Sequence, residues 1–274
     1  MIKVAIIYDF DGTLAPGNMQ EHDFIPAVGK SAKEFWNEAD SLAIEQDADS
    51  VLAYMERMIT SAREHGLSLR REAFASLGKT IRFYRGVEEW FGRMNSFAAE
   101  HGIKLVHYID SSGLKEIIEG TPIASEFRKI YASSFLYDND GNAYWPAVAI
   151  NYTNKTQFIF KINKGVETVY DSELVNKHLP DKDRALPFER MIFIGDGLTD
   201  IPCMTLVRRS KGHSIAVYNP EKPGSRDKMM ELIRDERVSH VCPADYSADR
   251  EIERVVRHIL CKMEADYKLS LLEP

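Results

Sequence analysis

The sequence has few cysteines and no long hydrophobic run. Its three cysteines, Cys203, Cys242 and Cys261, form no CxxC pair and show no spacing typical of a metal site, which excludes a disulfide framework or a zinc ribbon. The apolar run that begins at Ile2 ends at Asp9 and is too short for a signal peptide or a membrane span. We therefore expect a cytoplasmic protein with reduced, mostly buried cysteines and no membrane partner.

Excess positive charge, internal repeats and low-complexity tracts are also absent. Lysine and arginine number 35 against 42 aspartates and glutamates, so the formal net charge is −7. This balance argues against nucleic acid as a partner, because a phosphate backbone calls for a basic face. The 274 residues are 44% hydrophobic, enough for one large domain or for a domain with a smaller companion. The oligomeric state is left open.

Apolar, β-branched runs alternate with helical patterns over most of the chain. A strand that is buried on both faces reads as a continuous apolar run, and strands separated by helices form a parallel sheet with helices on both sides. The pattern therefore predicts an α/β fold with a doubly wound parallel sheet. The expected strands are residues 2–8, 103–109, 191–194, 213–218 and 239–242, with a hairpin near 135–145 and a final helix over 247–263.

A helical segment interrupts this alternation after the first strand. Apolar residues recur at helix spacing in two stretches, near 35–43 and 51–62, and the pattern continues to about residue 79. We expect a small all-helical insertion at residues 16–82 and a core domain made of residues 1–15 and 83–274. The stripe that includes Trp36 and Tyr54 is expected to form the core of this insertion.

Polar, chemically reactive residues follow the apolar runs. Ligands of an open parallel sheet bind beyond the carboxyl ends of its strands, and residues two apart on a strand point the same way. Burying paired carboxylates beside a strand is costly unless a cation compensates them. The acids among these residues could bind a divalent cation, and a hydroxyl and an ammonium could bind a phosphate. The residues are Asp9, Asp11, Ser111, Lys155, Asp196 and Asp200.

The order of these motifs resembles the haloacid dehalogenase superfamily, in its phosphatase branch and closest to phosphoserine-phosphatase-like members. The first family motif, DxDx(T/V), is matched by residues 9–13 (DFDGT), and the last, GDGxxD, by residues 195–200 (GDGLTD). The second motif, a strand that ends in serine or threonine, is matched by Ser111, and the third, a lysine at a helix start, by Lys155. The resemblance covers most of the chain and implies a Rossmann-like core with a helical cap formed by the insertion.

The resemblance also implies a role for each matched residue. Asp9 is expected to be the nucleophile that takes the phosphoryl group, and Asp11 the general acid and base. Mg²⁺ is expected to be held by the Asp9 and Asp196 side chains and the Asp11 carbonyl, with Asp200 supporting the site from nearby. The residues expected to bind the substrate phosphate are Gly12, Thr13, Ser111, Ser112 and Lys155.

The expected function is therefore Mg²⁺-dependent hydrolysis of a small phosphorylated metabolite. With an ordinary aspartate pKa of about 3.9, Asp9 is ionised at neutral pH and ready to attack. As an acid, Asp11 needs a raised pKa, which we expect from closure of the insertion over the site. Two alternatives stay open: a phosphotransferase or phosphomutase, and a non-catalytic phosphate-binding regulatory protein.

Plainer interpretations of single residues also stay open at this point. Asp9 and Asp11 could cap a strand-to-turn junction, Ser111 could cap the helix that follows it, and Lys155 could be a surface lysine. A serine-hydrolase site fails, because GxSxG would need glycine where Ile109 stands. In the resembling phosphoserine phosphatases a glutamate after the first motif reads the substrate amine. Glu21 lies at a different spacing from the first motif, so specificity for phosphoserine is not carried over to this chain. Four arginines of the insertion could contact an anionic substrate or face water: Arg57, Arg63, Arg70 and Arg71.

Overall fold

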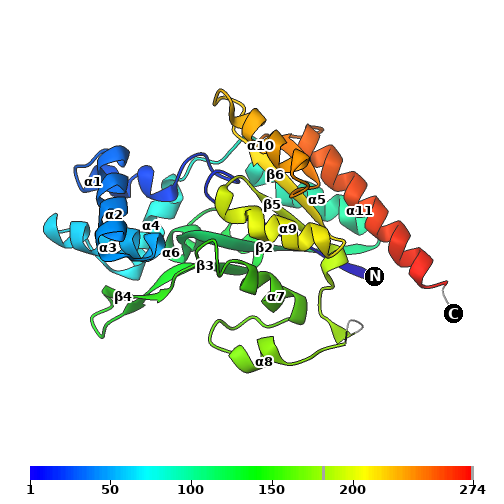
Figure 1. Ribbon diagram of the computed structural model, residues 1–274, viewed down its shortest axis with the longest axis horizontal. Coiled ribbons are helices and arrows are strands. Elements are labelled where there is room, and N and C mark those ends of the chain that lie inside the picture. Colours follow the sequence, from blue (N-terminus) through cyan, green and yellow to red (C-terminus); the bar gives the residue numbers. More distant parts are fainter. Residues whose placement is uncertain (181–182, 273–274) are drawn as a thin grey trace.

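The computed structural model describes residues 1–180 and 183–272 and contains, within them, a seven-stranded sheet. The strand order is β4-β3-β2-β1-β5-β6-β7, and every neighbouring pair is parallel except the antiparallel pair β3–β4. This arrangement confirms the expected α/β fold (Figure 1). The strands are β1 Ile2–Tyr8, β2 Ile103–Leu114, β3 Phe127–Tyr137, β4 Ala143–Val148, β5 Met191–Gly195, β6 His213–Tyr218 and β7 His240–Pro243.

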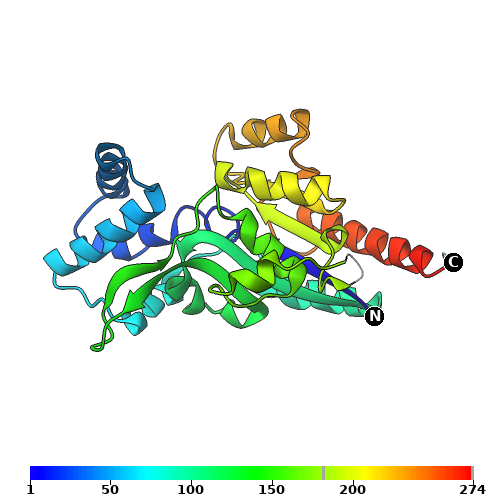
Figure 2. The same ribbon diagram turned by 60° about the horizontal axis from the view of Figure 1, so that its bottom comes forward.

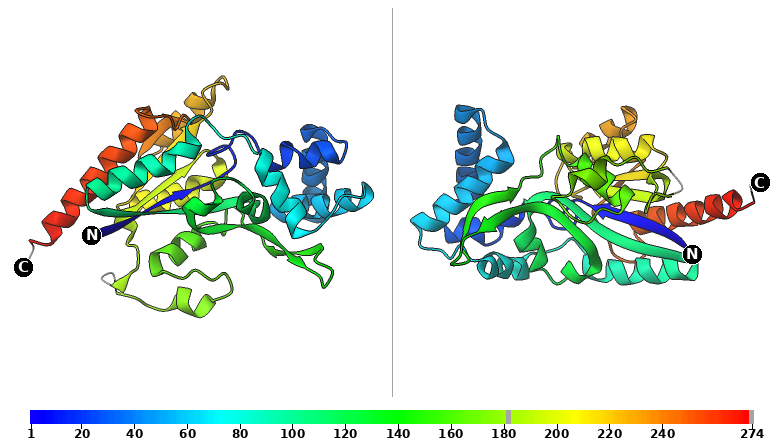
Figure 3. Two further views of the ribbon diagram at one scale, coloured as in Figure 1. Left: turned by 180° about the vertical axis from the view of Figure 1, so that it is seen from behind. Right: turned by 90° about the horizontal axis from the view of Figure 1, so that it is seen from below.

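Strand β1 lies at the centre of the sheet and is buried on both faces. Val4, Ile6 and Tyr8 belong to one hydrophobic cluster, and Ala5 and Ile7 to the other, as the alternation of side chains along a strand requires. Helices α5 (Val87–Glu100) and α11 (Glu251–Ser270) cover the first face, and α7 (Thr156–Lys164), α9 (Ile201–Arg209) and α10 (Ser225–Arg234) cover the second. The sheet is therefore doubly wound, as Figure 3 shows from behind and from below. Within the described residues, no helix is both long enough and apolar enough to cross a membrane.

The segment between β1 and α5 is helical and projects from the carboxyl edge of the sheet (Figure 1, blue to cyan). Ser31 and Glu34 form a capping box at the start of α2, and the carboxylate of Asp49 accepts the backbone N–H groups of Val51 and Leu52 at the start of α3. The chain enters and leaves this segment side by side, since the Tyr84 N–H donates to the Leu14 carbonyl at 2.9 Å. Its elements are η1 Met19–Glu21, α1 Phe24–Ala27, α2 Ala32–Gln46, α3 Ser50–Glu64, α4 Arg71–Leu77 and η2 Gly78–Thr80.

The β3–β4 hairpin extends out of the core and anchors the helical insertion (Figure 2). The Ala143 N–H donates to the Leu69 carbonyl at 2.9 Å, and the rings of Phe74 and Phe135 stack with centroids 5.5 Å apart. Helix α4 also packs against α6 (Lys115–Glu119) of the core. The insertion is thus fixed to the core through both its chain ends and this hairpin; its bounds at residues 16 and 82 stay a prediction.

Three elements differ from the sequence-based expectation. Strand β2 does not stop at residue 109 but continues to Leu114, because Asp110 and Ser111 pair with residues of β3. Strand β3 is 11 residues long, although only its last three were expected, and α11 begins at Glu251 instead of residue 247. The remaining short elements are η3 Ala124–Glu126, α8 Ser172–Asn176, η5 Phe188–Arg190 and η6 Leu198–Asp200.

Candidate active site

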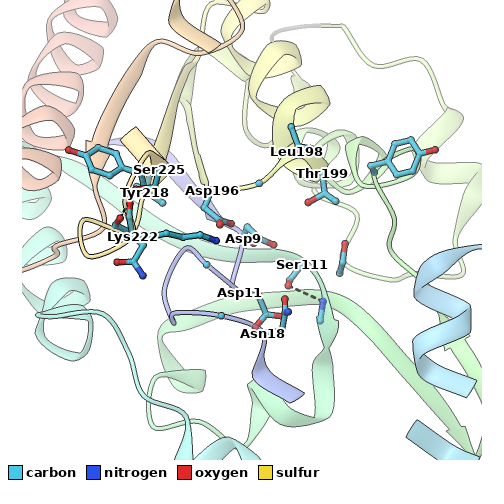
Figure 4. A pocket seen from close by; sticks show the side chains of 18 of the residues that line it. Asp9, Asp11, Asn18, Ser111, Asp196, Leu198, Thr199, Tyr218, Lys222 and Ser225 are labelled. Carbon is cyan, nitrogen blue, oxygen red and sulfur yellow. Dashed lines mark hydrogen bonds between the residues drawn. The ribbon is translucent and has the colours of Figure 1, made fainter. Parts of the chain in front are cut away.

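Four chain segments bring their polar residues together at the carboxyl edge of the sheet. Asp9 directly follows β1, Asp196 directly follows β5, Ser111 lies near the end of β2, and Lys155 directly precedes α7. Strands β2, β1 and β5 are neighbours and parallel, so their carboxyl ends meet at one edge. Figure 4 shows the side chains of Asp9, Asp11, Ser111 and Asp196 around one pocket.

An acidic cluster lies at the centre of this site. Carboxylate oxygens of Asp9, Asp196 and Asp200 all lie within 4.8 Å of one another. The buried ammonium of Lys155 donates to Oδ1 of Asp9 at 2.8 Å and to Oδ1 of Asp200 at 2.5 Å. Lys155 is fully buried, so the plainer interpretation as a surface lysine is wrong.

Burial and the neighbouring negative charges raise the pKa of two carboxyls of this cluster, those of Asp9 and Asp196. Burial raises the pKa of Asp9 to about 6; the positive charge of Lys155 opposes this rise, and the negative charge of Asp200 adds to it. Burial, with the charges of Asp9 and Asp200, raises the pKa of Asp196 well above its usual range. Burial alone would lower the pKa of Lys155, but the surrounding carboxylates of Asp200 and Asp9 raise it, so this lysine stays charged. One ammonium thus faces three carboxylates, a donor set that suits a hard divalent cation.

Asp200 braces the cluster. Its Oδ1 is bonded to Lys155, and its Oδ2 accepts the backbone N–H groups of Asp196 and Gly197, both at 3.1 Å. Both oxygens are therefore engaged within the protein, whereas Asp9 and Asp196 also line the open cleft. This placement fits the supporting role expected for Asp200.

Asp11 lies on the wall of the cleft beside the entrance to the helical insertion. Its Oδ1 accepts the N–H of Met19 at 2.8 Å, and its Oδ2 lies so close to Gly113 that a Cβ there would come within 2.8 Å. Burial, and then the charge of Asp9, raises the pKa of the Asp11 carboxyl well above its usual range. The group can therefore hold a proton at a pH where an exposed aspartate would have lost it.

Gly12 allows the first and last motifs to approach each other. Its φ of 76° is a left-handed conformation, and a Cβ on it would lie 2.0 Å from Oδ2 of Asp196. Thr13 is fully buried and donates its hydroxyl to Oδ1 of Asp196 at 3.4 Å. Gly12 lines the cleft and Thr13 does not, so Thr13 contacts a carboxylate where phosphate contact was expected.

Ser111 and Ser112 lie on the opposite side of the cleft. The Ser111 hydroxyl oxygen accepts the N–H of Gly113 at 3.1 Å, which leaves its own proton to donate. The Ser112 hydroxyl is buried and has no partner within the described residues. No side chain caps the start of α6 at Leu114, so Ser111 is not the helix cap that sequence alone left open.

Asp110 is a buried acid with no sequence-based role. It is fully buried, and both its carboxylate oxygens lack a hydrogen-bond partner in the described part of the chain. Burial raises its pKa well above the usual range, against the lowering influence of Lys155. Burial therefore favours the neutral, protonated form of this carboxyl.

The cleft above the acidic cluster has a volume of about 620 Å³, within the range of small-molecule sites. The helical insertion contributes one wall with Asn18, Gln20, Trp36, Val51 and Tyr54. Tyr54 belongs to the hydrophobic core and Trp36 packs against it, as expected, and both side chains also line this cleft. The Tyr54 hydroxyl also donates to the Ser112 carbonyl at 2.7 Å, which ties the insertion to β2.

Neither Glu21 nor the four arginines of the insertion line the cleft. Oε1 of Glu21 accepts the Trp36 indole N–H and the Asn18 amide, both at 2.7 Å, and Glu21 itself does not line the cleft. Arg57 pairs with Glu56, and Arg71 lies over the ring of Tyr137. The residues that line the cleft include none of Arg57, Arg63, Arg70 and Arg71.

Comparison with known proteins assigns the family. The family model for haloacid dehalogenase-like hydrolases matches residues 6–205, which is most of the chain. The chain therefore belongs to the haloacid dehalogenase-like hydrolases.

One relative is similar in sequence, and two solved structures are similar in fold. An uncharacterized protein of Borreliella burgdorferi is 28% identical over 285 residues, covering 94% of this chain and 96% of that protein. A substrate-bound phosphoserine phosphatase complex has a similar structure, with a TM-score of 0.56 at 15% identity over 94% of this chain and 99% of the other. A haloacid dehalogenase family hydrolase from Salmonella enterica serovar Typhi gives 0.56 at 14% identity, covering 86% of this chain and 66% of that chain.

Proposed function

We propose that this protein is a Mg²⁺-dependent phosphatase that hydrolyses small phosphomonoesters through an aspartyl phosphate on Asp9. The observation that carries the proposal is the cluster of Asp9, Asp196 and Asp200 within 4.8 Å, bonded to the buried Lys155 at the floor of a cleft. Family membership and the fold shared with phosphoserine phosphatase support it.

The Asp9 carboxylate attacks the phosphorus atom, and the bond to the ester oxygen breaks. Asp11 donates its proton to the leaving alkoxide, which its burial and raised pKa allow. Asp11 then takes a proton from a water molecule, which attacks the phosphorus of the aspartyl phosphate and releases inorganic phosphate. A carboxylate suits both proton transfers, because the group that has just given up its proton is the base that the second step needs.

Attack by Asp9 on a phosphate dianion must overcome repulsion between like charges. At 4 Å and an effective dielectric near 20, this repulsion is about 4 kcal/mol per pair of unit charges. Lys155 offsets part of it through its contact with Asp9. The Asp9 and Asp196 carboxylates, with the Asp11 carbonyl, would hold Mg²⁺, which supplies the remaining positive charge. The Ser111 hydroxyl, whose oxygen accepts the Gly113 N–H, would donate its own proton to a phosphoryl oxygen.

The test is a colorimetric screen of purified protein over a panel of phosphomonoesters, with Mg²⁺ or with a chelator. We expect phosphate release with Mg²⁺ and a loss of at least about 10³-fold on chelation or in Asp9→Asn. A parallel reaction with an added alcohol acceptor distinguishes hydrolysis from phosphoryl transfer: the proposal requires inorganic phosphate as the main product. A folded, Mg²⁺-supplied sample that is inert toward the whole panel would sink the proposal.

A further inference from the structure

The cleft reaches beyond the acidic cluster toward a second wall, which the family motifs do not include. This wall is formed by the end of β6, the loop after it and one face of α10, and its lining residues include Tyr218, Asn219, Lys222, Ser225 and Lys228. Ser225 and Lys228 are three positions apart on α10 and so share one face of the helix.

Lys222 and Lys228 are the cations of this wall. Both are exposed, and neither ammonium has a hydrogen-bond or ion-pair partner within residues 1–180 and 183–272. In Figure 4 the Lys222 side chain extends from its loop toward Asp196 and Asp9. The loop conformation is held locally, because the Ser225 hydroxyl donates to the carbonyls of Asn219 and Lys222 at 2.6 and 2.7 Å.

The other charges of the cleft do not offer a second anion a place. Lys155 is buried and fully engaged by Asp9 and Asp200. The wall from the insertion is neutral, with aromatic and amide side chains, and Glu21 behind it is bonded to Trp36 and Asn18. A substrate amine therefore has no free carboxylate on that wall, whereas an anion would find two free ammonium groups on the opposite one.

Building on the proposed phosphatase function, we propose that Lys222 and Lys228 bind a second anionic group of the substrate. The substrate class is then a phosphomonoester that also carries a carboxylate or a second phosphate, with its uncharged part against Trp36 and Tyr54. The ammonium groups act on the part of the substrate that does not react, and they set which ester is chosen. Unlike phosphoserine, an ester of this class need not carry an amine, so the protein needs no carboxylate to bind one.

The test measures a preference ratio in matched pairs of substrates. The pairs are glycerol 3-phosphate with 3-phosphoglycerate, and phenyl phosphate with 4-carboxyphenyl phosphate and with 1,4-phenylene bisphosphate. For each pair, kcat/KM of the doubly anionic ester is divided by that of its singly anionic partner, in the Mg²⁺-supplied protein. The glycerol pair and the two phenyl pairs differ in the distance between the reacting phosphate and the second anion, and the carboxylate and bisphosphate esters distinguish the two anion chemistries.

We expect the wild-type ratio to exceed about 10 in at least one pair, and to fall about tenfold in Lys222→Gln and severalfold in Lys228→Gln, as the loss of a hydrogen bond between charged groups would cause. Arg226→Gln is the matched control: it removes an exposed cation of the same helix that does not line the cleft, and the ratio should stay within twofold. A wild-type ratio near one in every pair, or a loss in Lys222→Gln that is equal for both members of each pair, overturns this inference and leaves the phosphatase function standing. Hydrolysis of no ester overturns both.

Discussion

Without a divalent cation, Asp9 should make the folded protein less stable as the pH rises. Burial raises its pKa to about 6, against an ordinary value of about 3.9 in an unfolded chain. The folded state then binds more protons than the unfolded state between these two values, so stability falls with rising pH in that window. Since each unit of pKa is worth about 1.36 kcal/mol, the full penalty above pH 6 is roughly 3 kcal/mol.

The perturbation is Asp9→Asn, which keeps the shape of the side chain and removes its titration. Between pH 4.5 and 7.5 the free energy of unfolding of this variant, relative to wild type in a chelator, should increase by about 2 kcal/mol. Removing the partner of Lys155 adds a component to this difference that does not depend on pH in that range. The assay is urea unfolding at several pH values, with and without Mg²⁺, which should abolish most of the difference. A difference that does not change with pH, or that shrinks as the pH rises, would refute the reasoning.

Three further predictions concern Asp11, Asp110 and Tyr54. Burial raises the pKa of Asp11, and its acid form is lost as the pH rises, so kcat/KM for alkyl phosphates should decline through a group that titrates above pH 5. Asp11→Asn should lower kcat about 10²-fold or more. A pH profile without such a group contradicts this role. Asp110→Asn should change the free energy of unfolding by less than about 1 kcal/mol in a urea titration, since burial raises the pKa of this acid and favours its neutral form. A loss of about 3–5 kcal/mol would instead show an ionised partner of Lys155. Tyr54→Phe removes the 2.7 Å hydrogen bond to the Ser112 carbonyl, which is worth about 1 kcal/mol. It should raise KM about fivefold in steady-state assays with little change in melting temperature. Unchanged kinetics would show that this contact does not hold the insertion against the cleft.

The sequence alone predicts those site residues that lie at the carboxyl end of a strand. Asp9, Ser111 and Asp196 could be placed at one edge because strands that alternate with helices must be parallel and their carboxyl ends must coincide. The central strand and the start of α7 at Lys155 follow from local apolar patterns, and the structure confirms them.

Other features depend on tertiary partners that no local pattern encodes. The apolar run of the second strand ends at Ile109, yet pairing with β3 keeps Asp110 and Ser111 in the strand. The free ammonium of Lys222 comes to the cleft through a loop over 200 residues from Asp9 in sequence. Trp36 reads as core, and only the arrangement of the insertion over the sheet shows that it also lines the cleft.

The most direct measurement is mass spectrometry of acid-quenched peptides after reaction with 4-nitrophenyl phosphate and Mg²⁺. The Asp11→Asn variant serves best, because this leaving group needs no proton, while breakdown of the intermediate is slowed. The account predicts one added phosphoryl group on the peptide that contains Asp9, chased away on longer incubation and absent when Asp9 is also replaced by Asn. Phosphate release with the label on another residue, or release that persists without Asp9, would contradict it.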